Sequence, residues 1–89
     1  MSAKFSPGRT VITPGALNSL DAESVQRSLT RHHRGDWGEL DAHDVAVNER
    51  ALVDGERLLS AYRDVRGTRF WIITEADRSV TTVLLPQEY

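Results

Sequence analysis

The C-terminal part of the chain changes from helical spacing to three β-rich runs in close succession, and this change constrains the fold most. The runs are Arg57–Asp64, Thr68–Glu75 and Ser79–Pro86, which are rich in β-branched and aromatic residues. The turns between them, DVRG and ADR, are too short to cross over a sheet. Neighbouring runs must therefore pair antiparallel, so we predict a three-stranded meander.

The N-terminal half carries signals for helix starts. Asp21 and Asp41 are N-cap candidates, because a short side-chain oxygen can accept from the unpaired N–H groups of a first helical turn. They predict helices over Ala22–His33 and Ala42–Asp54, each followed closely by a glycine suited to a left-handed turn. A Thr-Pro pair predicts a shorter helix over 14–19, where proline suits the first position.

Apolar spacing sets the inward faces of these elements. On the first long helix they are Val25, Leu29 and one of His32 or His33, and on the second Val45, Leu52 and Val53, with Ala46 or Ala51 nearby. In the middle strand, Trp71 and Ile73 share one face while Phe70 and Ile72 share the other. Both faces of this strand are apolar, so we expect helices on one face and a partner on the other.

We therefore expect an α+β fold in a single domain, residues 1–89. Two main helices plus a short N-terminal turn pack on a three- to four-stranded antiparallel sheet, in which RTVIT (residues 9–13) adds the edge strand. We expect residues 1–8 to form a mobile N-terminal lead-in segment, in which a Pro-Gly pair predicts a turn.

Composition limits the classes of function. The chain has no cysteine, which excludes disulfides and thiolate zinc sites and is typical of a reducing compartment. No apolar run approaches the roughly 20 residues that span a bilayer, and the first residues lack a secretory core, so we expect a cytoplasmic protein without a membrane partner. The net charge of −2 lacks the basic excess typical of nucleic-acid binding, which makes nucleic acid a less favoured partner.

The three histidines lack the spacing of a metal site. His32 and His33 are adjacent, and adjacent side chains on a helix point roughly 100° apart, so they do not easily share one ion. His43 and Asp44 have the same geometry, and there is no phosphate-binding glycine motif. We expect no metal and no cofactor, with one adjacent histidine under the sheet and the other solvated.

The stretch RHHRGDWG combines a basic helix end with a loop tryptophan. Cations in the last helical turn oppose the negative end of the helix dipole. Trp37 lies between two loop glycines, where an exposed indole is costly. Its ring either fills a gap between the helices and the sheet or stands half-exposed as an interface anchor.

The turn TEADRS between the last two strands has a structural and a functional interpretation. Asp77 and Ser79 can close the turn on backbone N–H groups, and Glu75 and Arg78 can pair across it. The same polar loop tip can also contact a partner. Together with the two tryptophans, the candidate binding residues are Trp37, Trp71, Glu75, Asp77 and Arg78.

The alternative to a binding protein is a metal-free endoribonuclease. Such an enzyme needs a general base, a general acid and a cation for the phosphate. Its catalytic candidates here are His32, His33, Tyr62 and Arg78, with Arg34, Arg69 and Glu75 as further polar groups. The strand, charged turn and strand of RFWIITEADRSVTTVLLP are similar in pattern to barnase- and RelE-like ribonucleases.

Four segments carry a resemblance to a known family: VITPGAL, RHHRGDWGELDAHDVAVNERAL, RLLSAY and WIITEADRSVTTVLLPQEY. Together they resemble an uncharacterised family of small bacterial proteins that are often labelled plasmid-related, some with a type I restriction-subunit label. The resemblance covers residues 5–89. It implies carriage on plasmids or other mobile elements, and it assigns no catalytic residue. A chain of this length has no room for a methyltransferase domain.

These observations favour a small non-enzymatic interaction protein of mobile elements. It would bind a protein partner from the host or the element, and modulation of host defence is one version of this hypothesis. A homodimer through the sheet would cover the second apolar face equally well. An accessory DNA-binding role is a third hypothesis, and its affinity would fall steeply with salt.

Overall fold

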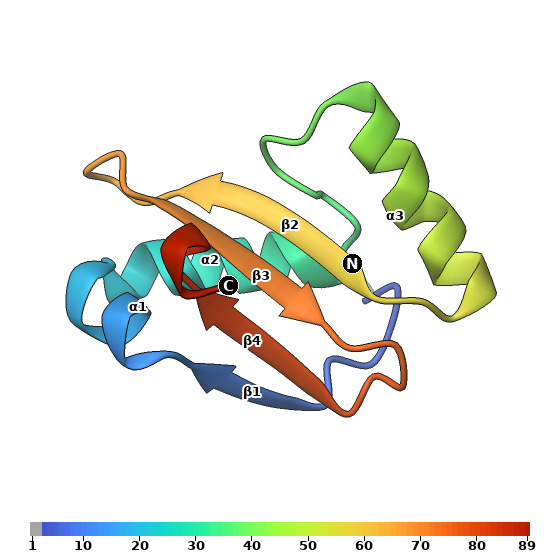
Figure 1. The fold of residues 1–89 in the computed structure, drawn as a ribbon, viewed down its shortest axis with the longest axis horizontal. Coiled ribbons are helices and arrows are strands. Elements are labelled where there is room, and N and C mark those ends of the chain that lie inside the picture. Colours follow the sequence, from blue (N-terminus) through green and yellow to red (C-terminus); the bar gives the residue numbers. More distant parts are fainter. Residues whose placement is uncertain (1–2) are drawn as a thin grey trace.

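The computed structural model describes residues 3–89 and contains one sheet with helices on one face and at one edge (Figure 1). The strands are β1 (Arg9–Ile12), β2 (Leu58–Arg63), β3 (Arg69–Thr74) and β4 (Val80–Leu84). The helices are α1 (Pro14–Ser19), α2 (Ala22–His33) and α3 (Ala42–Asp54), and a 3-10 turn, η1 (Pro86–Glu88), follows β4. The predicted α+β fold is confirmed.

Side-chain caps start the three helices at the predicted residues. Thr13, Asp21 and Asp41 each accept a hydrogen bond from the backbone N–H three positions further on, at 3.3, 2.9 and 2.8 Å. Gly35 and Gly55 follow α2 and α3 with φ of 81° and 72°, in the left-handed region that glycine enters without steric cost. These interactions are local in sequence, which explains why the helix bounds follow the prediction.

The sheet has the strand order β1-β4-β3-β2 and is mixed. The last three strands form the predicted antiparallel meander. β1 runs parallel to β4, so the expectation of a wholly antiparallel sheet is wrong in this detail. Three helices and two strands separate β1 from β4 in the chain, and no short turn sets the direction of β1.

α1 and α2 cover one face of the sheet (Figure 1). Phe70 and Ile72 point into this layer and are fully buried, as the alternation in the middle strand predicts. On α2, Val25, Leu29 and His32 form the inward face. The main core cluster consists of Ala16, Leu20, Val25, Tyr62, Phe70, Ile72, Val83 and Leu85.

α3 lies beside β2 rather than under the sheet (Figure 1). Its packed face contains Val45, Asn48, Ala51 and Leu52. The prediction that Val53 points inward is wrong, because this side chain is 85% exposed. At about 100° per residue, Val53 lies roughly 120° from the centre of the packed face, and the helix presents only that face to β2.

The N-terminal segment, which we expect to be a mobile lead-in, contacts both α2 and β4 in its described part, and residues 1 and 2 lie outside the described residues. The Lys4 N–H donates to the His33 carbonyl at 2.7 Å, and the Phe5 ring packs edge-on against the His33 ring at 5.8 Å between centroids. The Pro7 carbonyl accepts from the Thr81 hydroxyl at 2.7 Å. Residues 4–8 therefore connect the end of α2 to β4.

Candidate functional site

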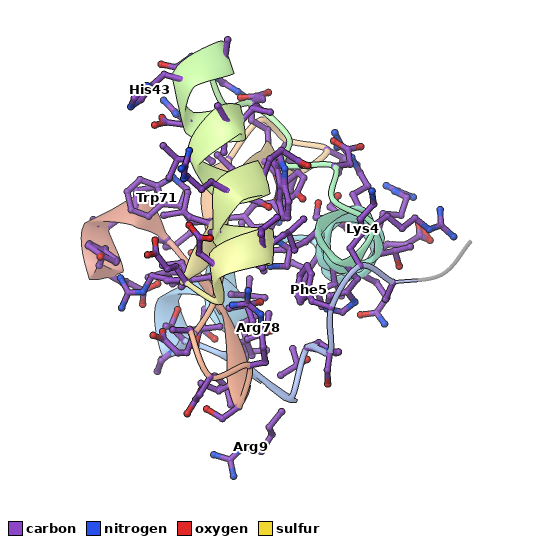
Figure 2. All side chains as sticks on the ribbon, turned by 90° about the vertical axis from the view of Figure 1, so that its right-hand side faces the viewer. Lys4, Phe5, Arg9, His43, Trp71 and Arg78 are labelled. Atoms are coloured by element: carbon purple, nitrogen blue, oxygen red, sulfur yellow. The ribbon has the colours of Figure 1, made fainter. Side chains whose placement is uncertain are left out.

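An open groove of about 570 Å³ lies between α3 and the face of the sheet opposite α2. Leu59, Ala61 and Trp71 form its floor, because they alternate in β2 and β3 with the residues buried beneath α2. Figure 2 shows Trp71 and Phe5 on opposite sides of the sheet. Val47, which is 50% exposed, lines the groove from α3. We call this surface the outer groove.

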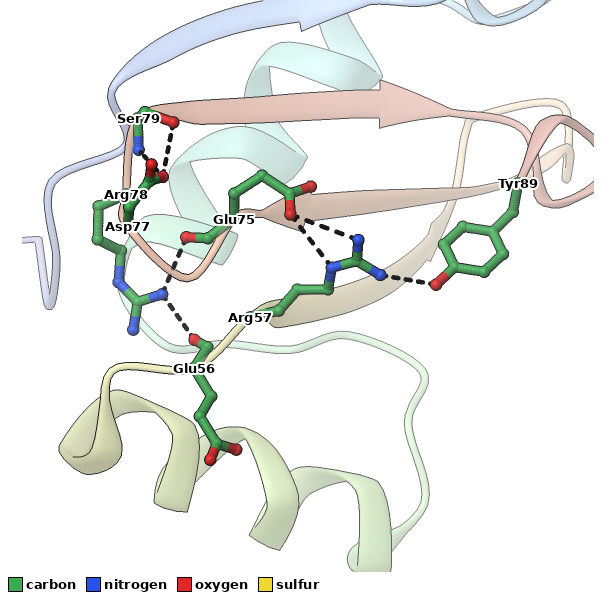
Figure 3. A network of polar contacts seen from close by, with 7 residues as sticks. All are labelled: Glu56, Arg57, Glu75, Asp77, Arg78, Ser79 and Tyr89. Carbon is green, nitrogen blue, oxygen red and sulfur yellow. Dashed lines mark hydrogen bonds and ion pairs between the residues drawn. The ribbon is translucent and has the colours of Figure 1, made fainter.

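Charged side chains of both signs surround the apolar floor of the outer groove. Asp44 lines it on the α3 side, and Arg57 and Arg69 line it on the sheet side. Arg57 is fixed: it contacts the Glu75 carboxylate at 3.4 Å and donates to the Tyr89 hydroxyl at 2.6 Å (Figure 3). Within residues 3–89, neither Asp44 nor Arg69 takes part in an ion pair, so both charges face solvent in the groove.

The turn from Glu75 to Ser79 is closed as predicted by an aspartate. The Asp77 carboxylate accepts from the Ser79 N–H at 2.9 Å and from the Ser79 hydroxyl at 2.6 Å, and both bonds lower the pKa of Asp77 (Figure 3). The predicted side-chain pair between Glu75 and Arg78 does not form, since the Glu75 carboxylate contacts Arg57 instead.

Arg78 has a structural role in this fold. Its guanidinium donates to the carbonyls of Glu56 at 2.6 Å, Glu75 at 3.2 Å and Ala51 at 3.2 Å, which ties the β3–β4 turn to the last turn of α3 (Figure 3). The Ala51 carbonyl lies in the last turn of α3 and the Glu56 carbonyl just beyond it, where a cation opposes the helix dipole. Its φ of 61° lies in the left-handed region, so the side-chain contacts offset backbone strain.

Trp37 fills the gap between the helices and the sheet. The side chain is only 3% exposed, and its Nε1 donates to the Glu49 carboxylate at 2.7 Å. Its ring stacks against Phe5 at 6.3 Å and meets His32 edge-on at 5.7 Å. The structure therefore corresponds to the gap-filling interpretation, and the buried ring offers little surface to a partner.

His32 is the histidine beneath the sheet, and it lies in a directed chain of hydrogen bonds. The Pro7 carbonyl can only accept, so the Thr81 hydroxyl donates to it and in turn accepts from Thr74 at 2.7 Å. Thr74 then accepts from His32 Nε2–H at 2.9 Å, which leaves Nδ1 to accept from the Ser60 hydroxyl at 2.5 Å. The surroundings thus select one neutral tautomer of His32.

The Ser60–His32 pair has the contacts of a nucleophile and its base, but it is enclosed. Both side chains are 0% exposed. Burial, followed by the charges of His33 and Arg78, lowers the pKa of His32 to about 3. A ring that is neutral and sealed within the core reaches no substrate in this conformation.

Two of the four residues of the ribonuclease hypothesis, His32 and Tyr62, are buried in the core. His33 is partly buried, burial lowers its pKa, and its Nε2 has no hydrogen-bond partner among residues 3–89. Burial raises the pKa of Tyr62, whose hydroxyl donates to the Asp36 carbonyl at 2.6 Å. Within residues 3–89, none of His32, His33, Tyr62 and Arg78 lines the outer groove or either of two smaller surface hollows.

No group of three or more His, Cys, Asp or Glu side chains is placed to hold a metal ion within the described residues. His43 lies exposed in the first turn of α3. The helices described for residues 3–89 are all too short or too polar to cross a membrane.

Two features of the outer groove were not recognised from the sequence. The Asn48 side chain on α3 donates to the Leu59 carbonyl at 2.6 Å and accepts from the Leu59 N–H at 3.1 Å, which fixes α3 against the free edge of β2. A polar residue on the packed face of a helix is the signal that could have marked it. The position of Arg57 beside Tyr89 depends on where η1 folds back, and no local pattern encodes that.

Comparisons with protein-family models, with curated proteins and with solved structures give no match for this chain.

Proposed function

We propose that this chain is a small non-enzymatic binding protein of bacterial mobile genetic elements, which holds a protein partner in the outer groove. Carriage on mobile elements rests on the resemblance of the four sequence segments described above. The partner comes from the host or from the element itself, and host defence proteins are one class of such partner.

The observation that carries the proposal is the composition of the outer groove. Its floor combines Trp71 with aliphatic side chains, and free charges stand at its rim. Protein interfaces have this anatomy: an apolar centre enriched in aromatic residues and arginine, inside a polar rim. A partner helix with an apolar stripe would cover Trp71, and an acidic side chain on its flank would meet Arg69.

The experiment is affinity capture from a host lysate, followed by measurement of the dissociation constant of the purified partner. Trp71→Ala should weaken binding by a factor of about 30, the effect of removing a central aromatic contact of about 2 kcal/mol. Arg69→Glu should weaken binding about tenfold through repulsion of the acidic flank. Arg27→Glu is the matched control, since Arg27 is exposed on α2, and it should leave binding unchanged.

Two results would contradict the proposal. The first is a partner whose dissociation constant changes by the same factor in Arg69→Glu and in Arg27→Glu. Such a partner would bind outside the outer groove or bind non-specifically. The second is growth arrest with RNA cleavage on expression of the chain, which would favour an enzyme. Circular dichroism of each variant checks that the fold is retained.

A further inference from the structure

The two edges of the sheet differ in whether their outward backbone groups already have hydrogen-bond partners. At the β2 edge, the Ala61 N–H donates to the Trp37 carbonyl at 3.2 Å and the Ala61 carbonyl accepts from the Glu39 N–H at 2.7 Å. The Asn48 amide satisfies both backbone groups of Leu59. The outward backbone groups of β2 at these two positions are therefore occupied, so this edge does not accept another strand there.

The β1 edge is open. The backbone N–H groups of Arg9 and Thr13 donate to the carbonyls of Ser79 and Val83, both at 3.0 Å. In a parallel pair, alternate residues point both backbone groups at the same neighbour, so Thr10 and Ile12 point theirs away from β4. Figure 1 shows β1 at the border of the sheet, and within residues 3–89 no element pairs with its outer side.

We propose that the open edge of β1 pairs with the same edge of a second copy of this chain, antiparallel, with Val11 on the two-fold axis. In this register, Thr10 of each copy lies opposite Ile12 of the other, and the two pairs exchange all four outward N–H···O bonds. The two Val11 residues face each other as the central pair. The two sheets then form one continuous sheet of eight strands, through an isologous contact.

Charge complementarity supports this register over pairing with an unrelated strand. The same pairing places Arg9 of one copy opposite Thr13 of the other, on the sheet face that carries η1. The Glu88 carboxylate is held beside Thr13: it accepts from the Thr13 hydroxyl at 2.5 Å and from the Gly15 N–H at 3.0 Å. Arg9 extends away from its own molecule in Figure 2, and it forms no ion pair within residues 3–89. Each arginine would therefore reach the other copy's Glu88.

The surface used is separate from the outer groove, so the two proposals fail independently. Trp71→Ala and Arg69→Glu should leave the oligomeric state unchanged. A strand of four residues makes a small contact, and we expect a weak, concentration-dependent dimer.

The test measures the mass of the full chain by sedimentation equilibrium from about 10 µM to about 1 mM, a range that covers weak association. Val11→Glu and Val11→Lys each place like charges opposite one another on the axis, so each variant alone should be monomeric. An equimolar mixture of the two should dimerise again, because opposite charges then meet. Arg9→Glu should raise the dimer dissociation constant roughly three- to thirtyfold, and Arg50→Glu, on α3, should not change it.

A wild-type chain that stays monomeric over the whole range would overturn the proposal. So would a dimer that persists in Val11→Glu, or Val11→Glu and Val11→Lys copies that stay monomeric when mixed. Circular dichroism of the single variants must match that of the wild type, since Val11 is only partly buried and its replacement leaves the core intact. If either charged variant unfolds, the dimer dissociation constants of Arg9→Glu and Arg50→Glu decide. The proposal stands if only Arg9→Glu raises the constant, and it is overturned if the two variants behave alike.

Discussion

Lowering the pH from about 7 to about 5 should reduce the free energy of unfolding by about 2 kcal/mol through His32 alone. Burial sets the folded-state pKa of this ring at about 3, against an ordinary value of 6.5. The unfolded chain binds a proton as the pH falls through 6.5, whereas the folded chain stays neutral at this position. The contribution of the neutral ring is therefore complete above pH 6.5, and it is lost as the pH falls toward 3.

The size of this effect is large for a small domain. Below pH 6.5, each unit of pH removes about 1.4 kcal/mol, so the whole window from 6.5 to 3 amounts to about 5 kcal/mol. Small domains have total stabilities of about 5–15 kcal/mol, so this one group can account for much of an acid transition.

The assay is urea unfolding followed by circular dichroism at several pH values, for the wild type, His32→Gln and His43→Gln. His32→Gln should be less stable at pH 7, because the hydrogen-bond chain from Ser60 to Thr74 is disturbed. Its loss of stability between about pH 7 and about pH 5 should be smaller than that of the wild type by about 2 kcal/mol. His43→Gln replaces an exposed histidine on α3 and serves as the control. Equal pH dependence in His32→Gln and the wild type would refute the reasoning.

Three further predictions concern stability. Asn48→Ala should lower the free energy of unfolding by about 2–4 kcal/mol in urea titrations, because the N–H and C=O of Leu59 both lose their partner; an unchanged midpoint would contradict this role. Gly38→Ala should lower the free energy of unfolding by more than about 4 kcal/mol, because a Cβ would lie 2.0 Å from the Ala61 carbonyl oxygen of β2. Gly55 has a similar φ but open space around it, so Gly55→Ala should lower the free energy of unfolding by only about 1 kcal/mol. Equal thermal midpoints for these two variants would argue against the close approach. Arg78→Ala should be less stable than Arg78→Gly by about 1 kcal/mol, because both lose the three carbonyl contacts but only alanine keeps the left-handed strain.

Local interactions made the helices predictable. Asp21 and Asp41 accept hydrogen bonds from residues three positions away, and such contacts can be inferred from a short window of sequence. The alternation of Phe70 and Ile72 with Trp71 was likewise sufficient to assign the two faces of β3. The cost of exposing an indole in a loop made gap-filling one of two interpretations for Trp37, and the buried ring corresponds to that one.

Contacts between distant segments could not be predicted in the same way. The parallel direction of β1 depends on where β4 lies, and three helices and two strands separate these two strands in the chain. The partner of Glu75 is Arg57 rather than its neighbour in the turn, because the pairing of β2 with β3 brings Arg57 alongside. The enclosure of His32 depends in part on Phe5, whose ring packs edge-on against it and which lies far from it in the sequence.

The pairing of β1 with β4 has a consequence for the order of events during synthesis. Ribosomes add residues from the N-terminus, so Arg9–Ile12 emerges long before Val80–Leu84, the strand it must join. Until then, the Pro7 carbonyl lacks its β4 partner, the Thr81 hydroxyl. The helices and the first hairpin can form early, but closure of the core waits for β4, and a long loop must then close at an entropic cost. Without β4 the core therefore stays open, and the histidine that the folded chain buries is accessible to water.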